Sequence, residues 1–445
     1  MTSFAGMETA AVKLVRRYYV YAGVYTLAAS VIWGVNTLFL LDAGLSIGEV
    51  FIANSAWSAG TVLFEIPTGV VADTVGRRVS FLLSLVVLAS ATLGYVGLAE
   101  VGGGVVAFSI VSVIIGLGFT FYSGAMEAWL VDGVRALGFT GDFDKVFSRG
   151  QLVSGAAMLV GTVGGGVLGQ VDLSLPFLLR SGLLVLLFVL AFAGMDEIGF
   201  EPRRMSLREV PAEAMRMARE GVVFGWGNRS LRLLMLATAA QMGLFSWAWY
   251  AWQPYFLELL GEDAVWVAGV VAALLAVSMM VGNGIVEIVT RWCGRRSTVF
   301  IWAGAGFSLA LVGVGAVTAF VPAVALLFLG GVAIGVQAPV RQAFIHEVVP
   351  SGQRATVVSF DSMVTGGGSV VGQTSLGAYS EARGFSAGYI AAGLATIVAI
   401  PLHGLLRRQR DDADFFEGFR PEFACATPAV PAISTVAGDV TAERV

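Results

Sequence analysis

Long apolar stretches alternate with short polar segments along almost the whole chain. An α-helix needs about 20 predominantly apolar residues to cross the hydrocarbon core of a bilayer. Runs of this length with few or no charges predict an all-α membrane protein with twelve membrane-spanning helices, six in each half of the chain. The predicted spans are 18–41, 47–72, 79–99, 104–131, 150–171 and 175–195, followed by 231–257, 264–290, 297–319, 323–346, 355–379 and 385–406.

Polar segments separate and follow the two groups of spans. Residues 196–230 form the most charged part of the chain, and they predict a cytoplasmic linker with a short surface helix over 207–219. Residues 411–445 lose the apolar periodicity and are rich in Ala, Pro, Thr and acidic residues, which predicts a disordered cytoplasmic tail. The expected domains are a first six-helix bundle over 1–195, the linker over 196–230, a second six-helix bundle over 231–410 and the tail over 411–445.

The composition supports membrane insertion. The 445 residues are 57% hydrophobic and only 13% charged, whereas soluble domains carry about 25% charged residues. A soluble protein of this composition would lack the polar surface needed to cover itself, so the lipid bilayer is an expected partner. The net charge of −4 gives no argument for a nucleic-acid partner, and two cysteines are too few for a disulfide framework.

Lysine and arginine are distributed unevenly between the two sides of the predicted membrane. The chain holds 27 of these residues, and all except Arg180, Arg341 and Arg383 fall on one side, together with both termini. Because basic residues concentrate in cytoplasmic loops, we expect a multi-pass protein of a prokaryotic plasma (inner) membrane with both termini in the cytoplasm. Arg180 and Arg341 fall inside predicted spans.

The two halves of the sequence resemble each other. GRRVSF at 76–81 recurs as GRRSTVF at 294–300, after the second span of each half. EAWLVD at 127–132 recurs as QAFIHE at 342–347, at the end of the fourth span. Parallel halves of six spans are the architecture of many secondary transporters.

The polar loop GVVADTVGRR, residues 69–78, lies between spans two and three. It resembles the signature loop of the major facilitator superfamily, through Gly69, Asp73, Gly76, Arg77 and Arg78. The resemblance covers about residues 13–410. It implies two pseudo-symmetric six-helix bundles that rock about a central site. It also implies a charge relay, in which Arg77 pairs with Asp73 and Asp132 and helps to hold the cytoplasmic side shut.

The second copy of the loop has Arg291 where the aspartate would be, so the latch is expected in one half only. The resemblance is to twelve-span drug-efflux members, whose further motifs are incomplete here. Span four has no arginine, and the Gly run at 161–169 in span five has no proline. That run is similar to the GxxxG pattern of close helix packing.

Five ionisable side chains inside the predicted spans are candidates for proton coupling, because charges within a membrane are costly and are generally functional. Counted depths and the family architecture suggest two pairs, Glu127 with Arg341 across the cytoplasmic gate and Glu65 with Asp361 on spans two and eleven. Two neighbouring carboxylates would provide a proton site near neutral pH. The alternative is that these groups only hydrogen-bond the backbone near the cytoplasmic end. The candidates are Glu65, Glu127, Glu287, Arg341 and Asp361.

Span seven carries a cluster of aromatic residues in the stretch QMGLFSWAWYAWQPYFLELL, 241–260. Ligand pockets are mostly apolar and use a few oriented polar groups, which Gln241 and Gln253 could supply. The alternative is an aromatic belt at the membrane surface. The candidate cavity residues are Asn36, Gln241, Phe245, Trp249 and Gln337, with Tyr25 and Trp33 in addition.

These features favour a secondary active transporter that works by alternating access, without a cofactor or metal. We expect a monomer that exports an amphipathic small molecule or drug in exchange for protons. The alternatives are a proton-coupled importer of a polar nutrient and a membrane sensor that does not transport. An enzyme is not expected, because the chain has no nucleophile, base and acid constellation and contains only two histidines.

Overall fold

The computed structural model describes residues 2–139, 141–201, 209–350 and 354–416, which form helices joined by short turns. No β-strand occurs in these ranges, and Arg295 and Phe415 form an isolated bridge. The helices of the first half are α1 (Thr2–Ser30), α2 (Asn36–Asp42), α3 (Ile47–Thr74), α4 (Arg77–Glu100), α5 (Val105–Tyr122), α6 (Ala125–Ala136), α7 (Phe143–Val171) and α8 (Leu175–Gly194).

A short amphipathic helix, α9 (Val210–Gly221), and one π-helical turn (Val222–Trp226) lead into the second half. This helix agrees with the surface helix predicted in the linker, and it contacts α3 and α15. The helices of the second half are α10 (Arg229–Leu260), α11 (Val265–Gly284), α12 (Val286–Cys293), α13 (Arg296–Ala316), α14 (Phe320–Val348), α15 (Arg354–Thr396) and α16 (Ala399–Arg408).

The all-helical membrane fold is confirmed, whereas the count of twelve spans stays a prediction. Nine helical segments of the described chain are long and apolar enough to cross a membrane. Neither α1 nor α3 is among them: a turn after Ser30 cuts the first apolar stretch short, and α3 carries polar residues such as Asn54, Ser55 and Ser58 in its first half. The last two predicted spans form one continuous segment, interrupted at Gly384, whose φ is +83°.

Spans one, four, eight and twelve are each interrupted, and the breaks in spans one and four lie next to candidate site residues. Residues 31–35 form a turn between α1 and α2, in which Trp33 and Val35 donate backbone hydrogen bonds to carbonyls three residues earlier. Span four is broken at Gly124, whose φ of +74° lies in the left-handed region that favours glycine. Irregular backbone within a membrane occurs where it is buried in protein or lines a cavity.

The two halves pack against each other through equivalent helices. The two largest contacts between the halves each join the second predicted span of one half to the fifth of the other: α3 with α15 and α11 with α7. Gly166 of α7 and Gly269 of α11 let two backbones approach: a Cβ added to Gly166 would lie 2.7 Å from the Cα of Gly269. The glycine run of span five therefore does serve close helix packing.

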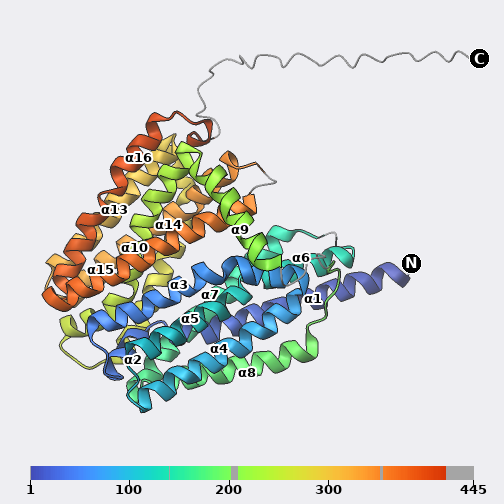
Figure 1. Cartoon of the computed structure of the whole chain (residues 1–445), viewed down its shortest axis with the longest axis horizontal. Coiled ribbons are helices and arrows are strands. Elements are labelled where there is room, and N and C mark those ends of the chain that lie inside the picture. Colours follow the sequence, from blue (N-terminus) through green and yellow to red (C-terminus); the bar gives the residue numbers. More distant parts are fainter. Residues whose placement is uncertain (1, 140, 202–208, 351–353, 417–445) are drawn as a thin grey trace, which may run out of the picture.

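The halves meet at one end of the molecule and diverge at the other (Figure 1). We call the end that holds residues 42–46 and 261–264 the closed end. The opposite end holds the loop 69–78, α9 and both ends of the described chain, and we call it the motif end. Each half has its own hydrophobic core, around Phe81 and Trp129 in the first and around Trp247 and Phe307 in the second.

At the motif end, each half is tied together by the chain that follows its last helix. In the first half, the Glu197 carboxylate accepts hydrogen bonds from the backbone N–H groups of Arg77 (2.9 Å) and Arg78 (3.0 Å). It thereby caps the N-terminus of α4, where the helix dipole favours a negative charge. The φ of Gly76 is +130°, and a Cβ there would lie 2.7 Å from the Glu197 carboxylate.

In the second half, Asp414 plays the same part at the start of α13. Its carboxylate accepts hydrogen bonds from Ser297, from N–H at 2.7 Å and from Oγ at 2.8 Å, and Asp414 is fully buried. The Arg295 guanidinium lies over the Phe415 ring, 4.4 Å from its centroid. The prediction of a disordered tail from residue 411 is therefore wrong for 411–416, because these residues dock on α13. Residues 417–445 lie outside the described ranges.

Candidate functional site

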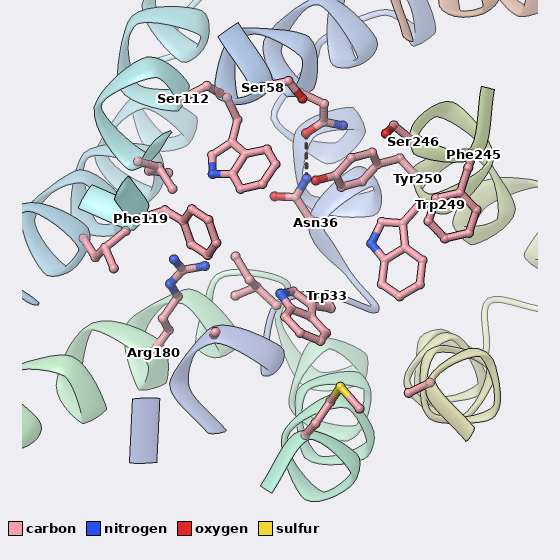
Figure 2. A pocket seen from close by; sticks show the side chains of 18 of the residues that line it. Trp33, Asn36, Ser58, Ser112, Phe119, Arg180, Phe245, Ser246, Trp249 and Tyr250 are labelled. Carbon is pink, nitrogen blue, oxygen red and sulfur yellow. Dashed lines mark hydrogen bonds between the residues drawn. The ribbon is translucent and has the colours of Figure 1, made fainter. Parts of the chain in front are cut away.

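A cavity of about 640 Å³ lies between the two halves. Helices α1–α5, α7 and α8 of the first half and α10, α11 and α15 of the second contribute to its walls, together with the turn at 31–35. Its lining is mostly apolar and aromatic, and its volume suits a drug-sized molecule. The aromatic walls include Trp33, Trp57, Phe119, Phe245 and Trp249 (Figure 2).

Polar side chains in the cavity are largely satisfied by one another. The break in span one places Asn36 at the wall, where its Nδ2 donates to Oδ1 of Asn54 at 2.9 Å (Figure 2). Tyr95 and Ser112 share a hydrogen bond between their hydroxyl groups. Gln373 of α15 donates across the halves to Ser58 Oγ of α3 at 3.2 Å. These pairs use only part of the polar lining, since Nδ2 of Asn54 and Oε1 of Gln373 have no partner among the described residues.

Arg180 forms no hydrogen bond of this kind. It is the one charged residue among the described residues that line the cavity, and only 7% of it is exposed. Its guanidinium extends from α8 toward the cavity beside Phe119 (Figure 2). A charge in the middle of a membrane helix costs about 2.5–3.5 kcal/mol on insertion scales. The sequence prediction did not include Arg180, although its charge inside span six was a signal that could have identified it.

The closed end is held by hydrogen bonds between the halves. Gln253 of α10 reaches the broken helix: its Oε1 accepts from the Thr37 N–H at 2.8 Å, and its Nε2 donates to the Trp33 carbonyl at 2.9 Å. The Thr37 hydroxyl donates to the Tyr250 carbonyl at 3.0 Å. Gln253 is fully buried, so it satisfies backbone groups freed by the break and seals this end. The expectation that it offers hydrogen bonds to a pocket was wrong.

The predicted cavity residues fall into two groups. Asn36, Phe245 and Trp249 line the cavity, as do Tyr25 and Trp33. Gln241 and Gln337 do not, and this part of the prediction is wrong. Both are buried inside the second half beside Gly304: a Cβ there would lie 2.8 Å from Nε2 of Gln241 and 3.8 Å from Nε2 of Gln337. The missing side chain of this glycine leaves the space that the amides occupy. A role in substrate binding for the other residues stays a prediction.

The residues of the loop 69–78 form the expected ion pairs within the first half. Arg77 pairs with Asp73, and its Nε lies 3.8 Å from Oδ2 of Asp132. Arg78 donates to the Phe192 carbonyl at 2.7 Å. A Cβ added to Gly69 would meet no atom within 4 Å. The loop therefore makes no close contact with the second half at Gly69, and a gating role stays a prediction.

Both predicted pairs of ionisable residues are wrong in this conformation. The Asp361 carboxylate pairs with Arg341, whose Nε donates to Thr238 Oγ1 at 2.8 Å. The Glu65 carboxylate instead accepts a hydrogen bond from Ser123 Oγ at 3.2 Å, next to the break in span four. Counted depth placed these groups at similar heights, but the orientation of each side chain around its helix decides its partner.

The remaining two candidates are exposed. Glu127 lies in the first turn of α6, on an exposed position away from the Arg341 pair. Glu287 lies on α12, where it pairs with Arg291 at 3.6 Å, and 87% of its side chain is exposed. Span eight ends before this position because α11 stops at Gly284. Glu287 is therefore not a charge buried within a span, which was the reason for proposing it.

Comparison with known structures identifies the fold. The nucleoside transporter NupG aligns with a TM-score of 0.72 at 12% identity, over 89% of this chain and 99% of that chain. The human organic anion transporter MFSD10 (TETRAN) aligns with a TM-score of 0.62 at 17% identity, over 88% and 99%. A D-xylose-proton symporter aligns with a TM-score of 0.63 at 14% identity, over 89% and 97%. Identities this low show the shared fold and no substrate.

Sequence comparison agrees with the structural likeness. A search of the curated proteins found no match. The family profile described as Major Facilitator Superfamily matches residues 19–292 and 285–437, which is nearly the whole chain. The broken helices, the cavity between two similar halves and the loop 69–78 lie within the matched residues. The chain is a member of the Major Facilitator Superfamily, a family of membrane transporters.

Proposed function

We propose that this protein is a proton-coupled secondary transporter that exports an amphipathic compound by alternating access, and that the motif end faces the cytoplasm. The observation that carries the proposal is the cavity of about 640 Å³, sealed at one end by Gln253, with the halves diverging at the other end. The concentration of Lys and Arg at the motif end supports its cytoplasmic orientation. The conformation is then open to the cytoplasm.

Alternating access requires the two ends to exchange roles. In the opposite state the bonds of Gln253 break and the loop 69–78 approaches the second half. Asp73 then faces the start of a helix of that half, where the positive end of the dipole favours its charge. We propose that Asp73, Arg77, Arg78 and Asp132, with Gly69 and Gly76, form this cytoplasmic gate.

We propose that Glu65 binds the coupling proton. It lies in α3, and in the described part of the chain its carboxylate has Ser123 and no basic side chain as a partner. Asp361 is neutralised by Arg341, which makes the pair a structural element of the second half. Glu65 also lies on a helix that packs against the opposite half, so a change in its charge acts at the moving interface.

Everted membrane vesicles that contain the protein and have an acidic interior test this proposal. Addition of an exported compound releases protons, so a panel of lipophilic dyes and drugs should produce a pH rise inside the vesicles. The signal should disappear in Asp73→Asn and in Glu65→Gln and persist in Glu262→Gln, an exposed carboxylate at the closed end. Absence of any signal with this panel, together with a signal from sugars, organic acids or amino acids, would replace export by nutrient import.

A further inference from the structure

We propose that the substrate is an amphipathic organic molecule with one negative charge, and that Arg180 binds its anionic group. The inference rests on the transport function proposed above and names the substrate class of the same cavity. It is carried by the state of the Arg180 guanidinium and by the charges around it.

Arg180 has neither an acidic nor a hydrogen-bonding partner within the described part of the chain. It forms no ion pair and donates no hydrogen bond there, and its Nε is buried without an acceptor. A guanidinium has five N–H donors and no acceptor, and buried polar groups are almost always hydrogen-bonded. The groups that interact electrostatically with Arg180 are the phenol groups of Tyr25, Tyr95 and Tyr250, and all three line the cavity. The donors of Arg180 are therefore available to whatever occupies the cavity.

The other arginine inside a predicted span has an acidic partner within the protein. Arg341 pairs with Asp361 and donates to Thr238, so its guanidinium is held by the second half itself. Arg180 receives neither a carboxylate nor a hydroxyl acceptor. A leucine would pack α8 without the cost of a buried charge, so packing gives no reason for an arginine. A ligand that brings the missing negative charge does.

The rest of the cavity determines the form of the ligand. No Asp or Glu occurs among the described lining residues, so the cavity carries a single positive charge and suits a single negative one. Asn36 and Asn54 bond each other through one N–H group, while Nδ2 of Asn54 has no partner among the described residues. Indole and phenyl rings cover much of the remaining wall, including Trp33, Phe245 and Trp249, and they suit an apolar body.

The two parts of such a ligand contact different halves of the protein. Arg180 lies on α8 of the first half, whereas Phe245 and Trp249 lie on α10 of the second, on the opposite side of the cavity in Figure 2. A molecule whose charge is bound by Arg180 and whose rings stack against α10 bridges the halves. Such a molecule favours the conformation in which it can contact Arg180 and the rings of α10 at the same time. A ligand shifts a conformational equilibrium only by binding one conformation more tightly than the other.

Binding of three matched probes tests the inference without any transport. Pyrenebutyrate, pyrenebutanol and pyrenebutylamine share an aromatic body and differ in charge. The purified full chain in nanodiscs of zwitterionic lipid is titrated with each probe, and energy transfer from the cavity tryptophans to pyrene is read against empty nanodiscs. Charge-assisted hydrogen bonds are about twice as strong as neutral ones, so we expect pyrenebutyrate to bind at least tenfold more tightly than pyrenebutanol, with pyrenebutylamine weakest.

Variants assign the preference to one residue. Arg180→Gln should lower the affinity for pyrenebutyrate at least tenfold, to that for pyrenebutanol, and leave pyrenebutanol binding unchanged. Arg180→Lys should retain part of the preference, since it keeps the charge but loses the fork geometry. Arg383→Gln, near the closed end and exposed, is the matched control and should bind as the unmodified protein does.

Three results would overturn the inference: equal affinities of the unmodified protein for the anion and the alcohol, an anion preference that survives in Arg180→Gln, or no saturable binding of any probe. If Arg180→Gln does not fold, the comparison of probes on the unmodified protein still decides. Binding needs neither gradient nor turnover, so a failed vesicle experiment leaves this result readable. Proton-coupled export without an anion preference would keep the transport proposal and remove this one.

Discussion

Replacement of Gln253 by leucine should open the closed end of this transporter. The Gln253 side chain makes two hydrogen bonds between the halves, one with the Thr37 N–H and one with the Trp33 carbonyl, and it is fully buried. Leucine has a similar size and makes neither bond. The two backbone groups then lack partners as long as this end stays closed, whereas water reaches them when it opens.

The size of the effect follows from the burial of these groups. A buried donor or acceptor left unsatisfied costs about 1–3 kcal/mol, so two of them cost at least about 2 kcal/mol in the closed arrangement. That is about a thirtyfold shift in the equilibrium between the two states. If about one molecule in a hundred is open at this end in the unmodified protein, about one in four would be open in the variant.

Distances between spin labels measure this equilibrium directly. Labels on Asp42→Cys and Glu262→Cys, both exposed and on opposite halves at the closed end, are introduced after the two native cysteines are replaced by serine. Gln253→Leu should add a population at longer distance. Gln409→Leu is the matched control, because Gln409 bonds only within its own helix region, to the Leu405 carbonyl. Identical distance distributions in Gln253→Leu and the control would refute the reasoning.

Three further predictions follow from single contacts. Gly166→Val should shift the same labels to the longer distance, since even a Cβ would lie 2.7 Å from the Cα of Gly269; an unchanged distribution would contradict the observed packing. Asp414→Asn weakens a charged cap worth about 1–2 kcal/mol, so we expect Tm to fall by about 2–4 °C in thermal unfolding. Asp361→Asn leaves the Arg341 guanidinium without its counter-charge at a cost of about 3 kcal/mol, which should lower Tm. A second change, Arg341→Met, should restore most of the lost Tm. If Tm does not recover, the ion pair is not the cause of the loss.

The fold could be predicted because its signals are local and repeated. Apolar runs of sufficient length predicted the helices, and the loop 69–78 predicted the ion pairs of Arg77 within its own half. The breaks at 31–35 and 124 were not predicted. Span one contains no proline that would signal its break, which is compensated by Gln253, more than 200 residues away in the chain. The docking of Asp414 was also not predicted. Residues 411–445 are rich in polar residues, and the sequence does not show which carboxylate among them is buried.

The site could be predicted only where position along a helix sufficed. Phe245 and Trp249 both line the cavity because residues four apart share a helix face, while their role in substrate binding stays a prediction. The proposed Glu65 and Asp361 pair failed because a count of residues gives depth but not direction around the helix. Arg180 was passed over for a similar reason: a charge in a span can face lipid, a partner or a cavity, and only the three-dimensional arrangement shows that it faces the cavity without an acidic partner.

The contacts within and between the halves explain how one ligand could control the whole movement. Glu197 binds the segment after α8 to the start of α4, and Asp414 binds the segment after α16 to the start of α13. Each half is therefore held as one body at the motif end. The contacts between the halves at the closed end are of another kind: hydrogen bonds of Gln253, Thr37 and Gln170, backbones that touch at glycines, and apolar contacts such as Phe51 with Trp247. A charge-assisted hydrogen bond to Arg180 together with a stacked ring adds free energy that favours one arrangement of the halves. A bridging anion acts on the relative position of the halves without any change inside either half, and this links the Arg180 guanidinium to the closed-end contacts in one mechanism.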